Sequence, residues 1–150
     1  MEGTMEENQL SRSFRTLTRL HRAIIATYLE TYGLYPGQPR LLFIIDRQPG
    51  CTVSQLVEET GQTKEAISVS VKRLEEAGYL HKEINPMDKR EKFLYLSEKG
   101  KTTADVIHNE FHRINEAMFE PLDEEEKRLL EDLFGRMSDR LQAFRTEGRA

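Results

Sequence analysis

The spacing of apolar side chains along the chain predicts a mostly helical protein. From Leu10 to Tyr32 these side chains recur every three or four residues, which keeps one apolar stripe along a helix of about six turns. Gly33 is expected to end that helix. The next apolar run, residues 40–45, is nearly continuous and stops at Pro49-Gly50. It predicts a short buried helix, with a buried strand as the alternative.

Two short helices are expected after this run. Thr52 and Gln55 have the spacing of a capping box, in which two reciprocal hydrogen bonds start a helix, here extending to about residue 60. Gly61 then provides a turn, and Thr63 can cap a second helix. The buried side of this second helix is marked by Ile67, Val71 and Leu74.

A charged β-hairpin is predicted directly after the second helix. Gly78 ends the helix, and residues 79–84 and 92–96 have strand-like sequences on either side of Asn85-Pro-Met-Asp-Lys-Arg. Asp88 lies two residues before Arg90, close enough to orient the guanidinium through a charge-assisted pair. A charged hairpin tip alone is most often a solvated turn. The order helix, turn, helix, hairpin is instead typical of a winged helix-turn-helix.

The C-terminal third predicts two more helices with apolar stripes, the second started by the capping-box pair Asp123 and Glu126. A small winged helix cannot cover all this apolar surface, so we expect the first helix and the last two to pair with a second copy of the chain. Packing within one chain is the alternative. The residues predicted at this interface are Leu10, Phe14, Leu17, Phe111, Ile114, Met118, Leu133, Met137, Leu141 and Phe144.

The composition fits one cytoplasmic domain spanning residues 1–150. No apolar stretch reaches the roughly 18 residues of a membrane-spanning helix, and the acidic N-terminus differs from a basic secretory signal. A single cysteine, Cys51, cannot form an intrachain disulfide, which fits a reducing compartment. Within this domain, residues 10–32 and 102–146 are predicted to form a helical dimerisation region, and residues 38–100 the DNA-binding region.

The charge distribution favours a polyanionic partner, although the net charge is -4. Residues 11–47 contain six cations and two carboxylates, and residues 64–101 contain nine cations and seven carboxylates. Residues 102–150, in contrast, contain seven cations and twelve carboxylates. The positive charge is therefore local, and a basic middle beside an acidic C-terminal part could orient the molecule on a polyanion, although a surface of mixed charge is the commoner reason for such numbers.

The outward face of the second short helix presents hydroxyls, cations and one apolar side chain, which suit phosphates, base edges and thymine methyls in a major groove. Cations in the hairpin are placed to reach a neighbouring minor groove. For the helix alone, an ordinary solvated face is the commoner explanation, and the hairpin shifts the balance toward DNA. With Asp88 orienting the wing, the predicted DNA contacts are Thr52, Ser54, Gln55, Thr63, Lys64, Glu65, Ser68, Val69, Lys72, Arg73, Lys89, Arg90 and Lys92.

Over about residues 38–134 the sequence resembles the MarR family of bacterial and archaeal winged-helix regulators. The similar segments are Thr52-Val-Ser-Gln-Leu-Val-Glu-Glu-Thr, residues 67–80, Asn85-Pro-Met-Asp-Lys-Arg and Leu96-Ser-Glu-Lys-Gly. Asp88 and Arg90 match the Asp-x-Arg wing signature of that family. Val69 departs from the polar or basic side chain that many members carry, which leaves the base preference open.

The resemblance implies a mainly α fold with a β-hairpin wing, flanked by dimerisation helices. It implies a transcriptional regulator, expected to be a repressor, whose second helix enters the major groove and whose Arg90 contacts the minor groove. Two-fold symmetry then places the two reading helices roughly 34–36 Å apart on a pseudo-palindromic operator. The resemblance also implies release of DNA by a small aromatic or anionic effector, with His21, Tyr28, Tyr32 and Arg40 as pocket candidates, although packing explains these residues equally well.

No catalytic motif is present: the chain lacks a Gly-rich phosphate loop, Gly-x-Ser-x-Gly, His-Glu-x-x-His and Cys-x-x-Cys. Neither an enzyme nor a cofactor is therefore expected. His108 and His112 have the spacing to share a metal ion, but Arg40 stands where a further ligand is needed, so a zinc-sensing regulator is the weaker alternative. Cys51 has no basic neighbour and is expected to be an inert thiol. A winged helix serving as a protein-interaction module is the alternative of another class.

Overall fold

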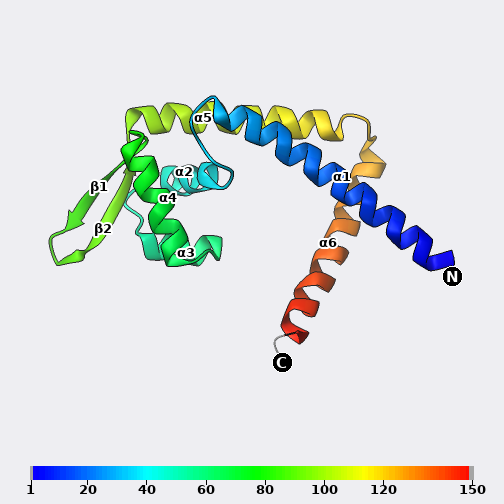
Figure 1. Ribbon diagram of the computed structural model, residues 1–150. Helices are drawn as coiled ribbons and strands as arrows, with labels where there is room; N and C mark the ends of the chain where they lie inside the picture. Colours follow the sequence, from blue (N-terminus) through cyan, green and yellow to red (C-terminus); the bar gives the residue numbers. More distant parts are fainter. Residues whose placement is uncertain (1, 149–150) are drawn as a thin grey trace. The chain divides into compact units, whose positions relative to one another are not determined.

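The computed structural model describes residues 2–148, with side chains from residue 8 onward. The described chain is mainly helical with one β-hairpin, which confirms the predicted fold class (Figure 1). By contacts it divides into two compact units within a single helix, unit 1 ending at Asn109 and unit 2 beginning at Glu110. The elements are α1 (Glu2–Glu30), α2 (Gln38–Arg47), α3 (Val53–Thr60), α4 (Lys64–Glu76), β1 (Leu80–Asn85), β2 (Asp88–Leu96), α5 (Glu98–Phe119) and α6 (Glu124–Glu147).

The first helix, α1, starts earlier than its apolar stripe indicated, at Glu2 instead of near Leu10. It ends at Glu30, and Gly33 in the following turn has a φ of 64°, a left-handed conformation that glycine adopts without strain. The amide of Leu34 donates to the carbonyl of Leu29, and both side chains are buried. The C-terminal end of α1 is thereby anchored in the core of unit 1.

The core of unit 1 is built on α2, α3 and α4. The segment at residues 40–45 is helical, so the strand alternative was wrong, and its side chains Leu41, Leu42, Ile44 and Ile45 are buried. Both short helices begin as predicted, α3 with a complete capping box and α4 with Thr63 as its N-cap. Helix α4 buries Ile67, Val71 and Leu74, which fixes its opposite face toward solvent.

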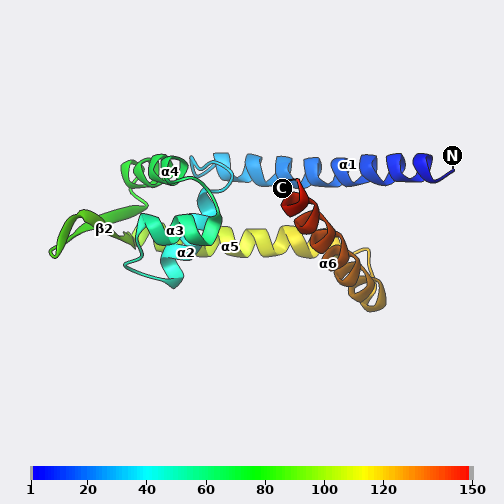
Figure 2. The ribbon, with the colours of Figure 1, turned by 90° about the horizontal axis from the view of Figure 1, so that it is seen from below.

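The hairpin is tighter at its tip than expected. The predicted turn covered residues 85–90, but the turn consists of Pro86 and Met87 alone, and β2 begins at Asp88 instead of Lys92. Pairing is regular from Leu80 opposite Leu96 to Ile84 opposite Lys92, and Asn85 then pairs with Asp88. Residues 89–91 are therefore left over on β2 as a bulge. Both ribbon views show the hairpin projecting away from α2, α3 and α4 (Figures 1 and 2).

An isolated β-bridge beside the hairpin was missed by the sequence analysis. Cys51 forms an isolated antiparallel bridge with Leu94 of β2, through which the Leu94 amide donates to the Cys51 carbonyl at 2.8 Å. The Gly50 amide donates to the Leu94 carbonyl, also at 2.8 Å. These bonds attach the base of the hairpin to the segment just before α3.

The start of α5 is locked onto the end of α4 by the segment Ser97-Glu-Lys-Gly. The Ser97 hydroxyl donates to the Gly78 carbonyl and accepts from the Gly100 amide at 3.0 Å. Lys99 donates to the Ala77 carbonyl at 2.8 Å and lies 4.5 Å from the Tyr79 ring centroid. This motif, noted in the sequence only for its family resemblance, thus joins the end of α4, the hairpin and α5.

Unit 2 contains the end of α5 and all of α6. Helix α6 begins with the predicted capping box, in which the Asp123 carboxylate accepts from the Glu126 amide at 2.8 Å and the Glu126 carboxylate from the Asp123 amide at 2.9 Å. None of the described residues of α6 is buried, although the helix carries a regular apolar stripe. Most of that stripe is exposed among the described residues.

Candidate nucleic-acid interface

The outer face of α4 is fully available for contact with a partner. The six predicted residues of α4 and its N-cap Thr63 are all exposed, including Val69, which keeps 51% of its accessible surface. Since Ile67, Val71 and Leu74 fill the buried side, the helix cannot rotate this face inward without emptying the core. We call the following set the reading face: Thr63, Lys64, Glu65, Ser68, Val69, Lys72 and Arg73.

Several of the residues predicted to contact DNA also cap helices, and this determines which of their hydrogen-bonding groups are left for DNA. The Thr52 hydroxyl oxygen accepts from the Gln55 amide at 3.3 Å, and the Gln55 side-chain oxygen accepts from the Thr52 amide at 2.8 Å. The Thr63 hydroxyl oxygen accepts from the Ala66 amide at 3.2 Å. Because these groups act here as acceptors, both hydroxyls and the Gln55 side-chain NH₂ keep hydrogens to donate to phosphate oxygens.

A hollow of about 480 Å³ lies between α3, α4 and the hairpin. Its lining contains four cations and two carboxylates, which favours an anionic occupant. Six predicted contacts line it together with the wing-orienting Asp88, namely Thr52, Ser54, Lys64, Ser68, Arg90 and Lys92. The remaining predicted contacts, Gln55, Thr63, Glu65, Val69, Lys72, Arg73 and Lys89, lie outside this lining.

Two polar lining residues were missed by the sequence analysis. Lys82 on β1 faces the hollow and pairs with Glu75 of α4 at 3.6 Å, while Glu91 lies in the bulge of β2. The strand alternation of β1 was the available signal for Lys82, because it places that side chain on a defined face of the hairpin. Glu91 had no such signal, since a bulge breaks the alternation of its strand.

The wing arginine is held by a turn around Asp88. The Asp88 carboxylate accepts from the backbone amide of Arg90 at 3.0 Å and lies 3.4 Å from the Arg90 Nε. Arg90 keeps 94% of its side-chain surface, so the ion pair contributes little to stability. The pair instead orients the guanidinium. Asp88 holds the Nε–H edge, and the terminal N–H groups remain available to a groove.

The candidate effector residues lie on α1, in the turn after it and on α2. The hydroxyls of Tyr28 and Tyr32 lie 3.3 Å apart, and the Tyr32 carbonyl accepts from the Tyr79 hydroxyl. Arg40 instead borders a separate hollow of about 390 Å³ between α2 and α5, where neither tyrosine nor His21 contributes. The grouping of Arg40 with His21 and the tyrosines around one effector site stays a prediction.

The two histidines of α5 have separate neighbours. His108 packs edge-on against Phe43, with ring centroids 5.7 Å apart, whereas His112 lies 3.3 Å from the Glu116 carboxylate. Among the residues that the structure describes, no group of three potential metal ligands occurs. Cys51 is buried, and desolvation raises the pKa of its thiol, which keeps it protonated and unreactive.

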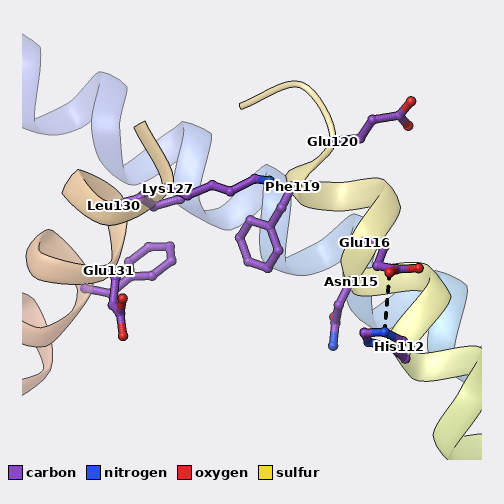
Figure 3. Close-up of a pocket in the computed structure, with 9 residues that line it drawn as sticks. His112, Asn115, Glu116, Phe119, Glu120, Lys127, Leu130 and Glu131 are labelled. Atoms are coloured by element: carbon purple, nitrogen blue, oxygen red, sulfur yellow. Dashed lines mark ion pairs between the residues drawn. The ribbon is translucent and has the colours of Figure 1, made fainter. Parts of the chain in front are cut away.

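A separate hollow of about 780 Å³ lies within unit 2, between the end of α5 and the start of α6 (Figure 3). The Phe119 ring lies between the two helices, and Leu130 and Phe134 also line the hollow. Charged groups border it, among them Lys127, which pairs with Glu124 at 2.9 Å. This hollow is an apolar recess with a charged edge, and the sequence analysis did not foresee it.

Comparisons with known proteins point to one family. A family model described as MarR family matches residues 32–91, the segment that contains α2, α3, α4, β1 and the first part of β2. Over this segment the chain is similar to the MarR family. The transcriptional regulator BilQ of Clostridium symbiosum is 27% identical over 115 residues, covering 77% of this chain and 80% of that protein.

Solved MarR-family structures agree with this fold over most of the chain. A MarR protein from Peptoclostridium difficile has a TM-score of 0.76 and 26% identity, covering 89% of this chain and 88% of its own. The PcaV regulator of Streptomyces coelicolor, solved with its natural ligand, has a TM-score of 0.68 and 23% identity, covering 88% and 91%. The matched segment and the named relatives support a helix-turn-helix transcriptional regulator similar to the MarR family. None of its described helices is long and apolar enough to cross a membrane.

Proposed function

We propose that this MarR-family regulator binds a pseudo-palindromic DNA operator as a homodimer and represses transcription. The observation that carries the proposal is the cation-lined hollow between α3, α4 and the wing, bordered by the exposed reading face. In this proposal α4 enters a major groove, Lys64 and Lys72 meet phosphates, and Arg90 enters the adjacent minor groove. A DNA-bound regulator acts in the cytoplasm.

The second copy of the chain is supported by uncovered apolar stripes on two helices. On α1, Leu10 is 71% exposed and Phe14 55%, and on α6, Leu141 is 68% and Phe144 64% exposed. Leu17, Leu133 and Met137 are also exposed, whereas Phe111, Ile114 and Met118 are half-buried. Contiguous apolar stripes of this kind mark interaction surfaces, and we propose that a second copy covers them together with the recess at Phe119.

Binding by phosphate neutralisation makes a direct test possible. We expect a labelled mixed-sequence duplex to bind at low ionic strength, with log affinity falling linearly and steeply as log salt rises. A flat salt response would favour the alternative of a protein-interaction module. Selection from a random duplex library should then return sequences with two-fold symmetry whose half-sites are about one helical turn apart.

The wing and the reading helix are separable by mutation. Arg90→Ala should weaken operator binding by about 1–3 kcal/mol per protomer and relax the preference at the bases beside the main contacts. Lys72→Ala should weaken binding to all sequences evenly and reduce the salt slope by about 1 per protomer. Lys101→Ala, which removes an exposed cation of α5 outside the hollow, is the matched control and should bind as the parent does. Unchanged affinity of the Arg90 variant would remove the wing from the mechanism.

Control by a small aromatic or anionic effector is part of the proposal. Its support is the family and the ligand-bound PcaV structure, since PcaV shares this fold. The physical requirement is that the effector binds more tightly to a dimer whose reading helices are wrongly spaced for DNA. Benzoate-type compounds added to the preformed complex should therefore release the duplex without changing the sedimentation of the dimer.

A further inference from the structure

The loop between α1 and α2 reaches the reading helix through one aromatic contact. The guanidinium carbon of Arg73, in the last turn of α4, lies 5.3 Å from the ring centroid of Tyr35. This distance is within the range of a cation–π interaction, and Tyr35 remains 60% exposed. Arg73 forms no ion pair among the residues that the structure describes, so this ring is the neighbour that restrains its guanidinium.

The Tyr35 ring stands on a rigid support. The Tyr35 amide donates to the side-chain oxygen of Gln38 at 2.8 Å, and Gln38 itself is 4% exposed. On its other side Leu34 is buried and bonded to the last turn of α1. A few residues earlier, the Tyr32 carbonyl accepts from the hydroxyl of Tyr79, just beyond α4. The loop therefore cannot drift away from α4 without breaking buried contacts.

The position of Arg73 on the helix places it among the groups that face DNA in the proposed function. It lies one turn after Val69, and four residues along an α-helix return to the same side. A guanidinium that stacks its flat face on a ring keeps its N–H groups in the plane, where they remain available to phosphate oxygens. A free arginine side chain, in contrast, loses conformational entropy when it binds.

We propose that Tyr35 is a positioning residue that holds Arg73 ready for a phosphate at the edge of the major groove. This inference rests on the proposed function, because it assigns to the α1–α2 loop a role in the same DNA contact. Tyr35 itself touches no DNA in this arrangement and acts only through the arginine.

A double-mutant cycle tests the proposal. Binding of a labelled mixed-sequence duplex is measured by fluorescence anisotropy at fixed salt for the parent, Tyr35→Leu, Arg73→Gln and the double variant. An exposed cation–π contact corresponds to about two- to fivefold in affinity per protomer, so Tyr35→Leu should bind roughly tenfold less tightly as a symmetric dimer. In the Arg73→Gln background the same replacement should change affinity by less than about twofold.

Two further variants separate positioning from a merely structural role. Tyr35→Phe keeps the ring and should bind as the parent, whereas a role of the hydroxyl predicts a loss. The cycle of Tyr35 with Lys72, whose side chain is exposed on the same helix away from the ring contact, should be additive. Thermal unfolding of each variant accompanies the binding measurements, since a fold-level effect lowers stability equally in both arginine backgrounds.

The outcomes distinguish this inference from the function on which it rests. Salt-dependent binding of the parent with additive Tyr35 and Arg73 effects overturns the positioning role alone. A parent that binds no duplex at low ionic strength overturns the proposed function, and this inference with it. Coupling confined to the Tyr35 and Arg73 pair supports the assignment.

Discussion

Gly100 in the first turns of α5 is the position where the fold tolerates a side chain least. A Cβ built on this residue lies 1.9 Å from the carbonyl oxygen of Tyr79 and 2.9 Å from its carbonyl carbon. The obstacle is backbone, and the carbonyl cannot swing aside because its oxygen accepts from the Ser97 amide at 3.0 Å. Tyr79 is 3% exposed, so its residue is also fixed by the core. Gly100→Ala must therefore displace α5 or break this junction.

The size of the effect follows from two opposing contributions. Overpacking costs about 1–3 kcal/mol and occasionally more, and so short a contact with a fixed backbone belongs at the upper end. Alanine favours a helix over glycine by up to about 1 kcal/mol, which offsets part of the loss. We expect a net decrease of about 2–3 kcal/mol in the free energy of unfolding. For a domain of this length that corresponds to a fall in Tm of roughly 5–10 °C.

Thermal unfolding followed by circular dichroism measures this change, at one protein concentration because a dimer has a concentration-dependent Tm. Gly135→Ala is the matched control. Gly135 also lies within a helix, α6, but its Cβ would meet nothing within 4 Å, and it points away from the apolar stripe of that helix. The control should keep or slightly raise the Tm. An unchanged Tm for Gly100→Ala would refute the argument from the close approach.

Two other substitutions or treatments follow from the structure. Cys51 should react with a thiol reagent more slowly in the native protein than in urea at the same pH, because burial raises its pKa and lowers its thiolate fraction; equal rates would contradict that burial. Asp123→Ala should lower the urea midpoint by the equivalent of about 1 kcal/mol through loss of the α6 cap. Asp123→Asn should keep most of the stability of the parent, because Asn is also a good N-cap. A midpoint of Asp123→Ala equal to that of the parent would show that the cap is not a stabilising contact.

The sequence predicted the elements whose local signals are strong. The capping residues Thr52, Thr63 and Asp123 marked three helix starts correctly, since each cap is a short-range interaction between residues three apart. The buried side of α4 was equally clear from its apolar spacing. Because the two sides of one helix are linked, the exposed face of α4 could be predicted as well.

Long-range contacts could not be predicted in the same way. The bridge between Cys51 and Leu94 and the approach of Gly100 to Tyr79 join residues far apart in the chain, with no pattern that marks the pair. The contact of Tyr35 with Arg73 belongs to the same class. The predicted boundaries of the hairpin strands were wrong for another reason. The charged residues from Asp88 to Arg90 were taken as turn formers, whereas they belong to β2 and include part of its bulge.

The bulge at residues 89–91 has a consequence for how this regulator could diversify. Regular pairing resumes at Ile84 opposite Lys92. The strand register from there to Leu80 opposite Leu96 therefore does not depend on which side chains occupy residues 89–91. In the proposed function, substitutions among these three residues would change the groups offered to a DNA groove, while the pairing of Leu80–Ile84 with Lys92–Leu96 stays the same. Target preference and foldability are thereby uncoupled in this hairpin, which lets one change under selection without endangering the other.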